Sequence, residues 1–138
     1  MILGPIAGRS GARSRLGARA ERVAARHLRR LGLRIVGRNV RTRSGEADLV
    51  AMDRKGVIVV VEVRSRIRGP GEGHPPESSI THAKRERMLA VAGDLSRRYH
   101  RTSGRPMPVR LDVIAVDWPA KGGRPDIRHY PDAVRRPV

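Results

Sequence analysis

The stretch Gly45–Arg66, GEADLVAMDRKGVIVVVEVRSR, decides the fold of this 138-residue chain. Its second half, Val57–Val63, is a run of apolar residues rich in valine and interrupted by one acid, Glu62. Such a run is typical of a strand that is buried on both faces and lies centrally in its sheet. A carboxylate in that strand is costly unless a partner or a bound ion compensates its charge.

The turn inside this stretch fixes the pairing of its two strands. Asp53 stands where a type I turn favours it, and Gly56 stands where the chain needs a positive φ. This chemistry predicts a three-residue loop, Arg54 to Gly56, that closes with a glycine bulge. Asp53 is then expected to pair with Val57.

Counting back from the turn places four charged residues opposite one another. Asp48 is expected to face Glu62, and Glu46 is expected to face Arg64. Period-2 alternation puts all four side chains on one face of the sheet. Opposed residues have Cβ atoms about 4.5–5.5 Å apart, so two facing acids repel each other. A divalent cation shared by Asp48 and Glu62 is the simplest compensation.

The composition favours a polyanionic partner. The formal charge is +17, from 30 Lys and Arg residues against 13 acids, which suits nucleic acid first and an anionic membrane surface second. No basic amphipathic stretch carries the aromatic residues that favour membrane binding. The alternative explanation for much of the positive charge is a genome-wide codon preference for arginine. With no Phe, one Trp and two Tyr, a base-stacking platform of the RRM or OB type is not expected.

The length of the chain and the absence of long apolar runs predict one domain without targeting signals. There is no cysteine, no apolar run of eighteen residues and no signal-peptide core, which together suit a cytoplasmic protein. We expect a flexible basic arm over residues 1–15, a folded domain over 16–134 and a loose tail over 135–138. The turn-rich stretch Gly69–Ser78 predicts a loop of the kind that contacts substrate.

Hydrophobic periodicity predicts the remaining elements. We expect helices at 16–31 and from 79 or 81 to 99, and further strands at 33–40, 109–116 and 126–130, the last as a short edge strand. The core order is helix, three strands, helix, strand. A helix that crosses between strands implies a parallel pair, and the hairpin implies an antiparallel one. The predicted fold class is therefore α/β, a mixed sheet flanked by helices.

Two charged residues occupy unusual positions on the expected helices. Glu21 projects close to Leu28, at the edge of the apolar stripe and at the rim of the core. The alternative is an ordinary exposed glutamate among arginines. Lys84 lies within the apolar stripe of the second helix, seven residues before Val91. The alternative for Lys84 is that the aliphatic part of its side chain covers apolar surface while the ammonium group stays in water.

The acids permit one kind of metal chemistry. Those available are Asp48 and Glu62, with Glu21 or Glu46 as helpers. They offer only oxygen ligands, which on a rigid strand pair suit Mg²⁺ or Mn²⁺. The histidines show no zinc-ligand spacing, and neither a GxSxG motif nor a P-loop is present. In a basic protein this pattern indicates phosphodiester chemistry through a metal-activated water.

These residues carry a resemblance to a known superfamily. The element order, with Asp48 and then Glu62-Val63-Arg64, resembles the PD-(D/E)XK nuclease fold, the restriction-endonuclease-like superfamily. More closely, the chain resembles the uncharacterised bacterial YraN-type family over about residues 17 to 134. The pattern of that family appears here as Gly17, Glu21, Ala24, Leu28, Gly32, Asn39, Gly45-Glu46-Ala47-Asp48-Leu49, Glu62-Val63-Arg64-Ser65-Arg66, Lys84 and Arg110-Leu111-Asp112-Val113.

The resemblance implies Asp48 and Glu62 as metal ligands. It also implies that Glu21 matches the first-helix acid of archaeal-type Holliday junction resolvases, which share this fold. The expected function is a Mg²⁺- or Mn²⁺-dependent DNA endonuclease, with branched DNA among its candidate substrates. Arg64 and Lys84 would contact the scissile phosphate. One departure is that Arg64 stands where the nuclease pattern usually has lysine, and arginine is planar and never a base.

Three interpretations therefore stay open. The first is the endonuclease, and the second is a nuclease-fold protein that binds DNA or RNA without cutting it. In the third, arginines neutralise Asp48 and Glu62, and the basic surface docks on ribosomal RNA or another polyanion. DNA is preferred to RNA as the partner, and the sequence is compatible with a homodimer. The arginines expected to contact nucleic acid are Arg41, Arg66 and Arg87.

Overall fold

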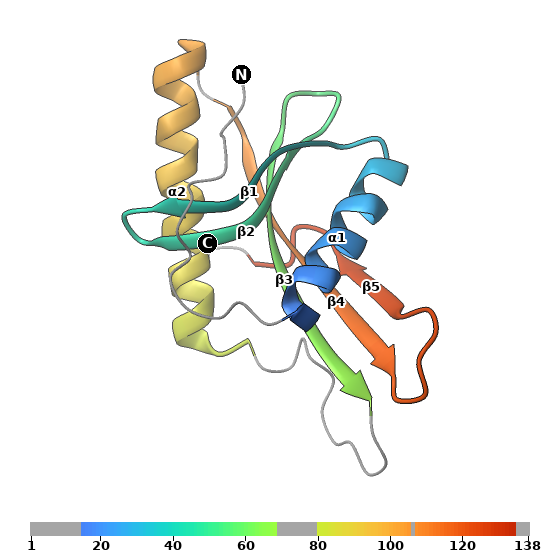
Figure 1. Cartoon of the computed structure of the whole chain (residues 1–138). Helices are drawn as coiled ribbons and strands as arrows, with labels where there is room; N and C mark the ends of the chain where they lie inside the picture. The colour runs from blue at the N-terminus through green and yellow to red at the C-terminus, as the bar shows by residue number, and fades with distance from the viewer. Residues whose placement is uncertain (1–14, 69–79, 106, 135–138) are drawn as a thin grey trace.

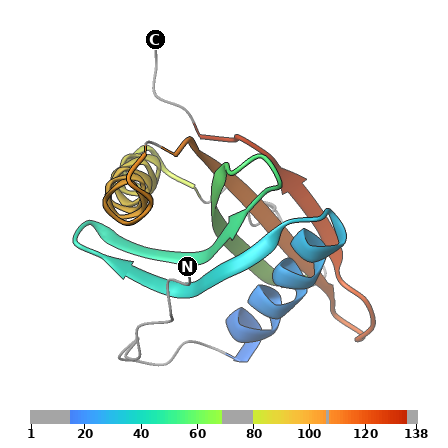
Figure 2. The same cartoon turned by 90° about the horizontal axis from the view of Figure 1, so that it is seen from above.

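A five-stranded sheet with one helix on each face forms the protein (Figures 1 and 2). The computed structural model describes residues 15–68, 80–105 and 107–134. The helices are α1 (Arg15–Arg30) and α2 (His82–Ser103). The strands, in their order across the sheet, are β1 (Arg34–Thr42), β2 (Gly45–Met52), β3 (Ile58–Arg68), β4 (Val109–Pro119) and β5 (Asp126–Tyr130). The predicted α/β class and element order are confirmed.

The sheet is mixed, as predicted. β3 and β4, which α2 connects, run parallel, and every other neighbouring pair is antiparallel. The predicted loop Gly69–Ser78 and tail 135–138 lie outside the described residues, as does the predicted arm except for Arg15, which begins α1. No helix in the described part of the chain is long and apolar enough to span a membrane.

The predicted turn between β2 and β3 is confirmed. The N–H of Asp53 donates to the carbonyl of Val57 at 3.0 Å, and the N–H of Gly56 donates to the carbonyl of Asp53 at 3.2 Å. Gly56 has φ +86°, the conformation that glycine adopts without steric cost. The turn sets the register that follows, and β3 lies in the centre of the sheet as expected.

The helix α2 and the strand β4 both extend beyond their predicted ends. α2 continues past Tyr99 to Ser103, where Gly104 closes it in the left-handed region with φ +76°. β4 continues past its predicted end at residue 116 and includes Trp118 and Pro119. The prediction was wrong because β3 is itself long, so that its last residue, Arg68, still pairs with Pro119.

Alternation along β3 divides the core into two layers. Val59 and Val61 pack beneath α1, with Leu28 among their neighbours in that cluster. Ile58 and Val60 pack on the opposite face, beneath α2. Because side chains alternate along a strand, the next even-numbered residues of β3 also face the α2 side. This parity directs Glu62 and the arginines that follow it to the same face.

The far end of the β1–β2 hairpin turns towards α2. Val40 and Ala47, which pair with each other, belong to the cluster beneath α2, whereas Leu49 belongs to the cluster beneath α1. Strict alternation would place Ala47 and Leu49 on one face. The change occurs beside Asn39, which has φ +48°, a left-handed conformation that asparagine tolerates.

α2 holds the turn of this hairpin through Asp94. Oδ2 of Asp94 accepts a hydrogen bond from the N–H of Ser44 at 3.0 Å. Hydrogen bonding from Ser44 lowers the pKa of Asp94 from 3.8 to about 2. Because the folded pKa is the lower one, the ionised carboxylate stabilises the fold above about pH 4. That stabilisation is lost as the pH falls towards 2.

Two glycines give a stability test with opposite signs. Gly45 has φ +150°, and a Cβ there would lie 3.3 Å from Cγ2 of Val91, so Gly45→Ala should destabilise the protein by about 1–3 kcal/mol. Gly93 lies within α2, where a Cβ would meet only the flexible end of Arg97, so Gly93→Ala should stabilise it by about 0.5–1 kcal/mol. Urea unfolding of both variants measures the difference. Equal effects would contradict the tight approach of α2 to Gly45.

Candidate active site

The backbone pairing of β2 with β3 ends at Leu49 and Val61. The same register would next bring the carbonyl of Ala47 to the N–H of Val63. That N–H instead donates to Oδ2 of Asp48 at 2.8 Å. A carboxylate side chain therefore replaces the backbone acceptor at the point where the two strands part.

The second acid, Glu62, lies beside this point. Its side chain faces the α2 side by the parity of β3, and Asp48 reaches the peptide group that joins Glu62 to Val63. Asp48 is 7% exposed and Glu62 is 8% exposed. Asp48 thus reaches the backbone directly beside Glu62, although neither acid takes part in the β2–β3 ladder.

Two cations reach Glu62 from different elements. Nζ of Lys84 lies 3.4 Å from Oε2 of Glu62, and a guanidinium nitrogen of Arg64 lies 3.6 Å from the same oxygen. Lys84 belongs to the first turn of α2, where its N–H donates to the side chain of Thr81, the N-cap residue, at 3.1 Å. Its side chain is 30% exposed, with the ammonium group at the buried carboxylate.

The expected pairing of Glu46 with Arg64 requires correction. The β2–β3 ladder ends before these residues, and Glu46 pairs with Arg41 across the β1–β2 hairpin. Their charged groups are 3.9 Å apart. The prediction failed because it extended an ideal ladder through the point where Asp48 interrupts it.

Glu21 lies on α1 and is buried with Ala24 and Leu28, so the exposed-glutamate alternative is wrong. Among residues 15–68, 80–105 and 107–134, no three His, Asp or Glu side chains gather into a group that could hold a metal ion. A metal site here would therefore depend on Asp48 and Glu62. Two carboxylates fit Mg²⁺, which proteins commonly hold through one or two carboxylates together with waters and substrate phosphates.

The three arginines expected to contact nucleic acid fall into two places. Arg41 and Arg87 flank the β1–β2 turn, where the stem of Arg87 packs over Gly45. Arg66 lies at the other end of the sheet, where it pairs with Asp117 of β4 at 2.8 Å.

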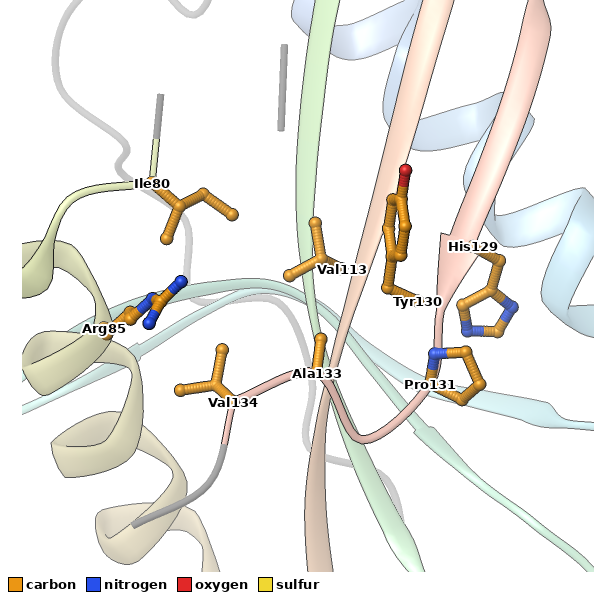
Figure 3. A pocket seen from close by; sticks show the side chains of 8 residues that line it. All are labelled: Ile80, Arg85, Val113, His129, Tyr130, Pro131, Ala133 and Val134. Carbon is orange, nitrogen blue, oxygen red and sulfur yellow. The ribbon is translucent and has the colours of Figure 1, made fainter. Parts of the chain in front are cut away.

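A hollow of about 440 Å³ lies between the start of α2 and the end of β5 (Figure 3). Ile80 and Arg85 border one side, Tyr130 borders the other, and Val113 lies between them. Val113 pairs with Glu62 across β3 and β4, and Arg85 follows Lys84 in α2. The lining is mainly apolar, with one exposed cation from α2.

A polar network on the α1 side was not predicted from the sequence. Asp112 is fully buried and accepts hydrogen bonds from Arg110 at 3.0 Å and from the N–H of Asp132 at 2.9 Å. Nε2 of His129 lies 2.7 Å from Asp112, and Nδ1 of His129 lies 3.1 Å from Nε2 of His27. The chain of contacts ties α1 and β5 to β4. The signal was Asp112 itself, an acid within an apolar strand.

The electrostatics of this network are set by competing effects. Burial would raise the pKa of Asp112, but hydrogen bonds from His129 and Arg110 outweigh it and the pKa lies below its ordinary value. Burial lowers the pKa of His27, and the neighbouring His129 lowers it further. The carboxylate therefore stays ionised in the folded protein at neutral pH.

Comparison with known proteins identifies the family. The profile of the uncharacterised protein family UPF0102 matches residues 20–116, which include Glu21, Asp48, Glu62 and Lys84. The chain belongs to the UPF0102 family. This membership confirms the resemblance to the YraN-type family.

Three UPF0102 proteins illustrate the similarity. One from Clavibacter michiganensis subsp. michiganensis is 45% identical over 112 residues, which cover 81% of this chain and 89% of the relative. One from Anaeromyxobacter dehalogenans is 39% identical over 132 residues, with 96% and 92% covered. One from Symbiobacterium thermophilum is 44% identical over 110 residues, with 80% and 87% covered.

A titration tests whether Asp48 and Glu62 share a metal ion. The double variant Asp48→Asn, Glu62→Gln should lose Mn²⁺ binding in isothermal calorimetry. It should keep its fold, because the amide oxygen introduced at position 48 can still accept from Val63 and two buried negative charges are removed. Glu86→Gln removes an exposed acid nearby on α2 and should bind Mn²⁺ as the wild type does. Unchanged Mn²⁺ binding by the double variant would remove the site.

Proposed function

We propose that this UPF0102 protein binds DNA and cuts it as a metal-dependent endonuclease. The observation that supports this most is the meeting of two buried acids from neighbouring strands beneath a lysine from α2. The formal charge of +17 supports a polyanionic substrate. Branched DNA is among the candidate substrates.

Each residue near the site has a role in this proposal. Asp48 and Glu62 would hold Mg²⁺ or Mn²⁺, which when bound supplies an activated water and stabilises charge on the phosphate. Lys84 holds a phosphate oxygen as a compact point charge. Arg64, whose guanidinium also lies at Glu62, orients that carboxylate and adds a second positive charge.

The contacts of Glu62 also favour a second candidate. Lys84 and Arg64 together place two positive charges within 3.4 and 3.6 Å of this carboxylate, which is enough to compensate its burial without a metal ion. In that case the protein binds nucleic acid without cutting it. DNA binding that survives EDTA, with no cleavage in Mg²⁺ or Mn²⁺, would favour this candidate.

A cleavage screen separates the two candidates. Linear, flapped and four-way-junction DNA are incubated with the protein in Mg²⁺, in Mn²⁺ and in EDTA. The endonuclease should cut at least one substrate when metal is present, and Asp48→Asn should abolish the cutting while DNA binding remains. Cutting that is equally fast in Asp48→Asn would contradict the proposal.

The two cations at Glu62 give a further test. Lys84→Met keeps the apolar stem and removes the ammonium group, so it should reduce cleavage or phosphate-dependent binding more than Arg64→Ala does. Arg64→Lys should preserve function or improve it. If Lys84→Met is silent and Arg64→Ala is not, Lys84 only covers the core and the two roles must be exchanged.

A further inference from the structure

Near the C-terminal ends of β3 and β4 and the start of β5, three arginines surround one buried carboxylate. Asp117 of β4 is 2% exposed. Its oxygens lie 2.8 Å from Nε of Arg66, 3.0 Å from an amino nitrogen of Arg68 and 3.3 Å from an amino nitrogen of Arg128. Hydrogen bonds from Arg66 and then Arg68 lower the pKa of Asp117 to about 2, so this carboxylate is ionised throughout the neutral range.

The cluster holds more positive charge than Asp117 requires. One well-oriented guanidinium compensates a buried carboxylate, and Arg66 makes that contact with two of its nitrogens. Arg68 and Arg128 contact Asp117 in addition, and their side chains remain 52% and 32% exposed. The exposed acid Asp126 lies 3.5 Å from Arg68.

The cluster lies on the same face as the candidate active site. Arg66 and Arg68 follow Glu62 at even spacing along β3, and Arg128 pairs with Ala115, the neighbour of Arg64 in β4. Figure 1 shows this end of β3 running on past the start of α2. Four residues separate Glu62 from Arg66, which is roughly 13 Å along a strand.

We propose that Arg66, Arg68 and Arg128, held in place by Asp117, form a phosphate clamp that binds the nucleic-acid backbone away from the cutting site. The clamp rests on the proposed function in one respect, that the ligand is nucleic acid. Guanidinium groups suit phosphate because they offer paired N–H donors in a fixed plane. A phosphate in the clamp therefore fixes the register of the strand that passes Glu62.

The test compares two double variants that remove the same charge. Arg68→Gln with Arg128→Gln removes the two additional arginines of the clamp and leaves the buried Arg66–Asp117 pair, so the variant should fold. Lys121→Gln with Arg124→Gln removes two exposed cations from the adjacent β4–β5 turn. Binding of a short fluorescent duplex to the full chain is then measured over a range of salt concentrations.

Counterion release predicts the result. Loss of one or two phosphate contacts should make the log–log salt slope shallower by about 0.9–1.8 in the clamp variant. The turn variant should keep the wild-type slope. Equal slopes in the two variants would overturn the clamp while leaving DNA binding in place. A wild-type slope near zero would instead remove polyanion binding, and with it the proposed function.

Asp117→Asn gives a second test, in which overall charge and the geometry of the clamp predict opposite changes in DNA affinity. This variant makes the protein more positive, so binding by overall charge alone would become tighter. A clamp loses the carboxylate that orients its three arginines, so binding should become weaker. Thermal unfolding shows whether the variant is folded, and if it is not, the two double variants decide. Tighter DNA binding by folded Asp117→Asn would overturn the clamp.

Discussion

The hydrogen bond from the N–H of Val63 to Asp48 is the constraint on which the site depends. A backbone carbonyl would ordinarily accept at this position and continue the β2–β3 ladder. Because a side chain accepts instead, β2 is released from β3, and the β1–β2 hairpin turns towards α2. The replacement of a backbone acceptor by a side chain leaves two buried acids, Asp48 and Glu62, where the two strands part, and a charge is costly to bury there.

The rest of the structure compensates that cost. The connection of β3 to β4 through α2 brings Lys84 over Glu62, and β3 itself supplies Arg64. Both cations approach the same oxygen of Glu62, so the charge of this acid is balanced before any ligand arrives. An incoming phosphate, itself an anion, would meet two positive charges that are already oriented. Under the proposed function, this preorganisation would stabilise a phosphate group at the site.

Local chemistry was enough to predict the central strand, the turn at Gly56 and the register of the β2–β3 ladder as far as Leu49 and Val61. The periodicity of α2 predicted that Lys84 lies on the buried face. It could not show whether the aliphatic part of the side chain merely covers apolar residues or the ammonium group contacts an acid, because both arrangements use the same face. The prediction that the β2–β3 ladder continues beyond Leu49 was wrong. The ladder ends there because the side chain of Asp48, rather than a backbone carbonyl, accepts the hydrogen bond from Val63. Asp112 and Asp117 find their partners across tertiary contacts that periodicity does not encode.

The most direct measurement is a crystal structure of the protein grown with Mn²⁺, with anomalous scattering used to locate the ion. We expect one Mn²⁺ peak at about 2.0–2.2 Å from carboxylate oxygens of Asp48 and Glu62. The hydrogen bond from Val63 to Asp48 should persist, and Lys84 should remain beside the ion. A structure in saturating Mn²⁺ with no peak between the two acids, and with Lys84 and Arg64 still on Glu62, would contradict the account.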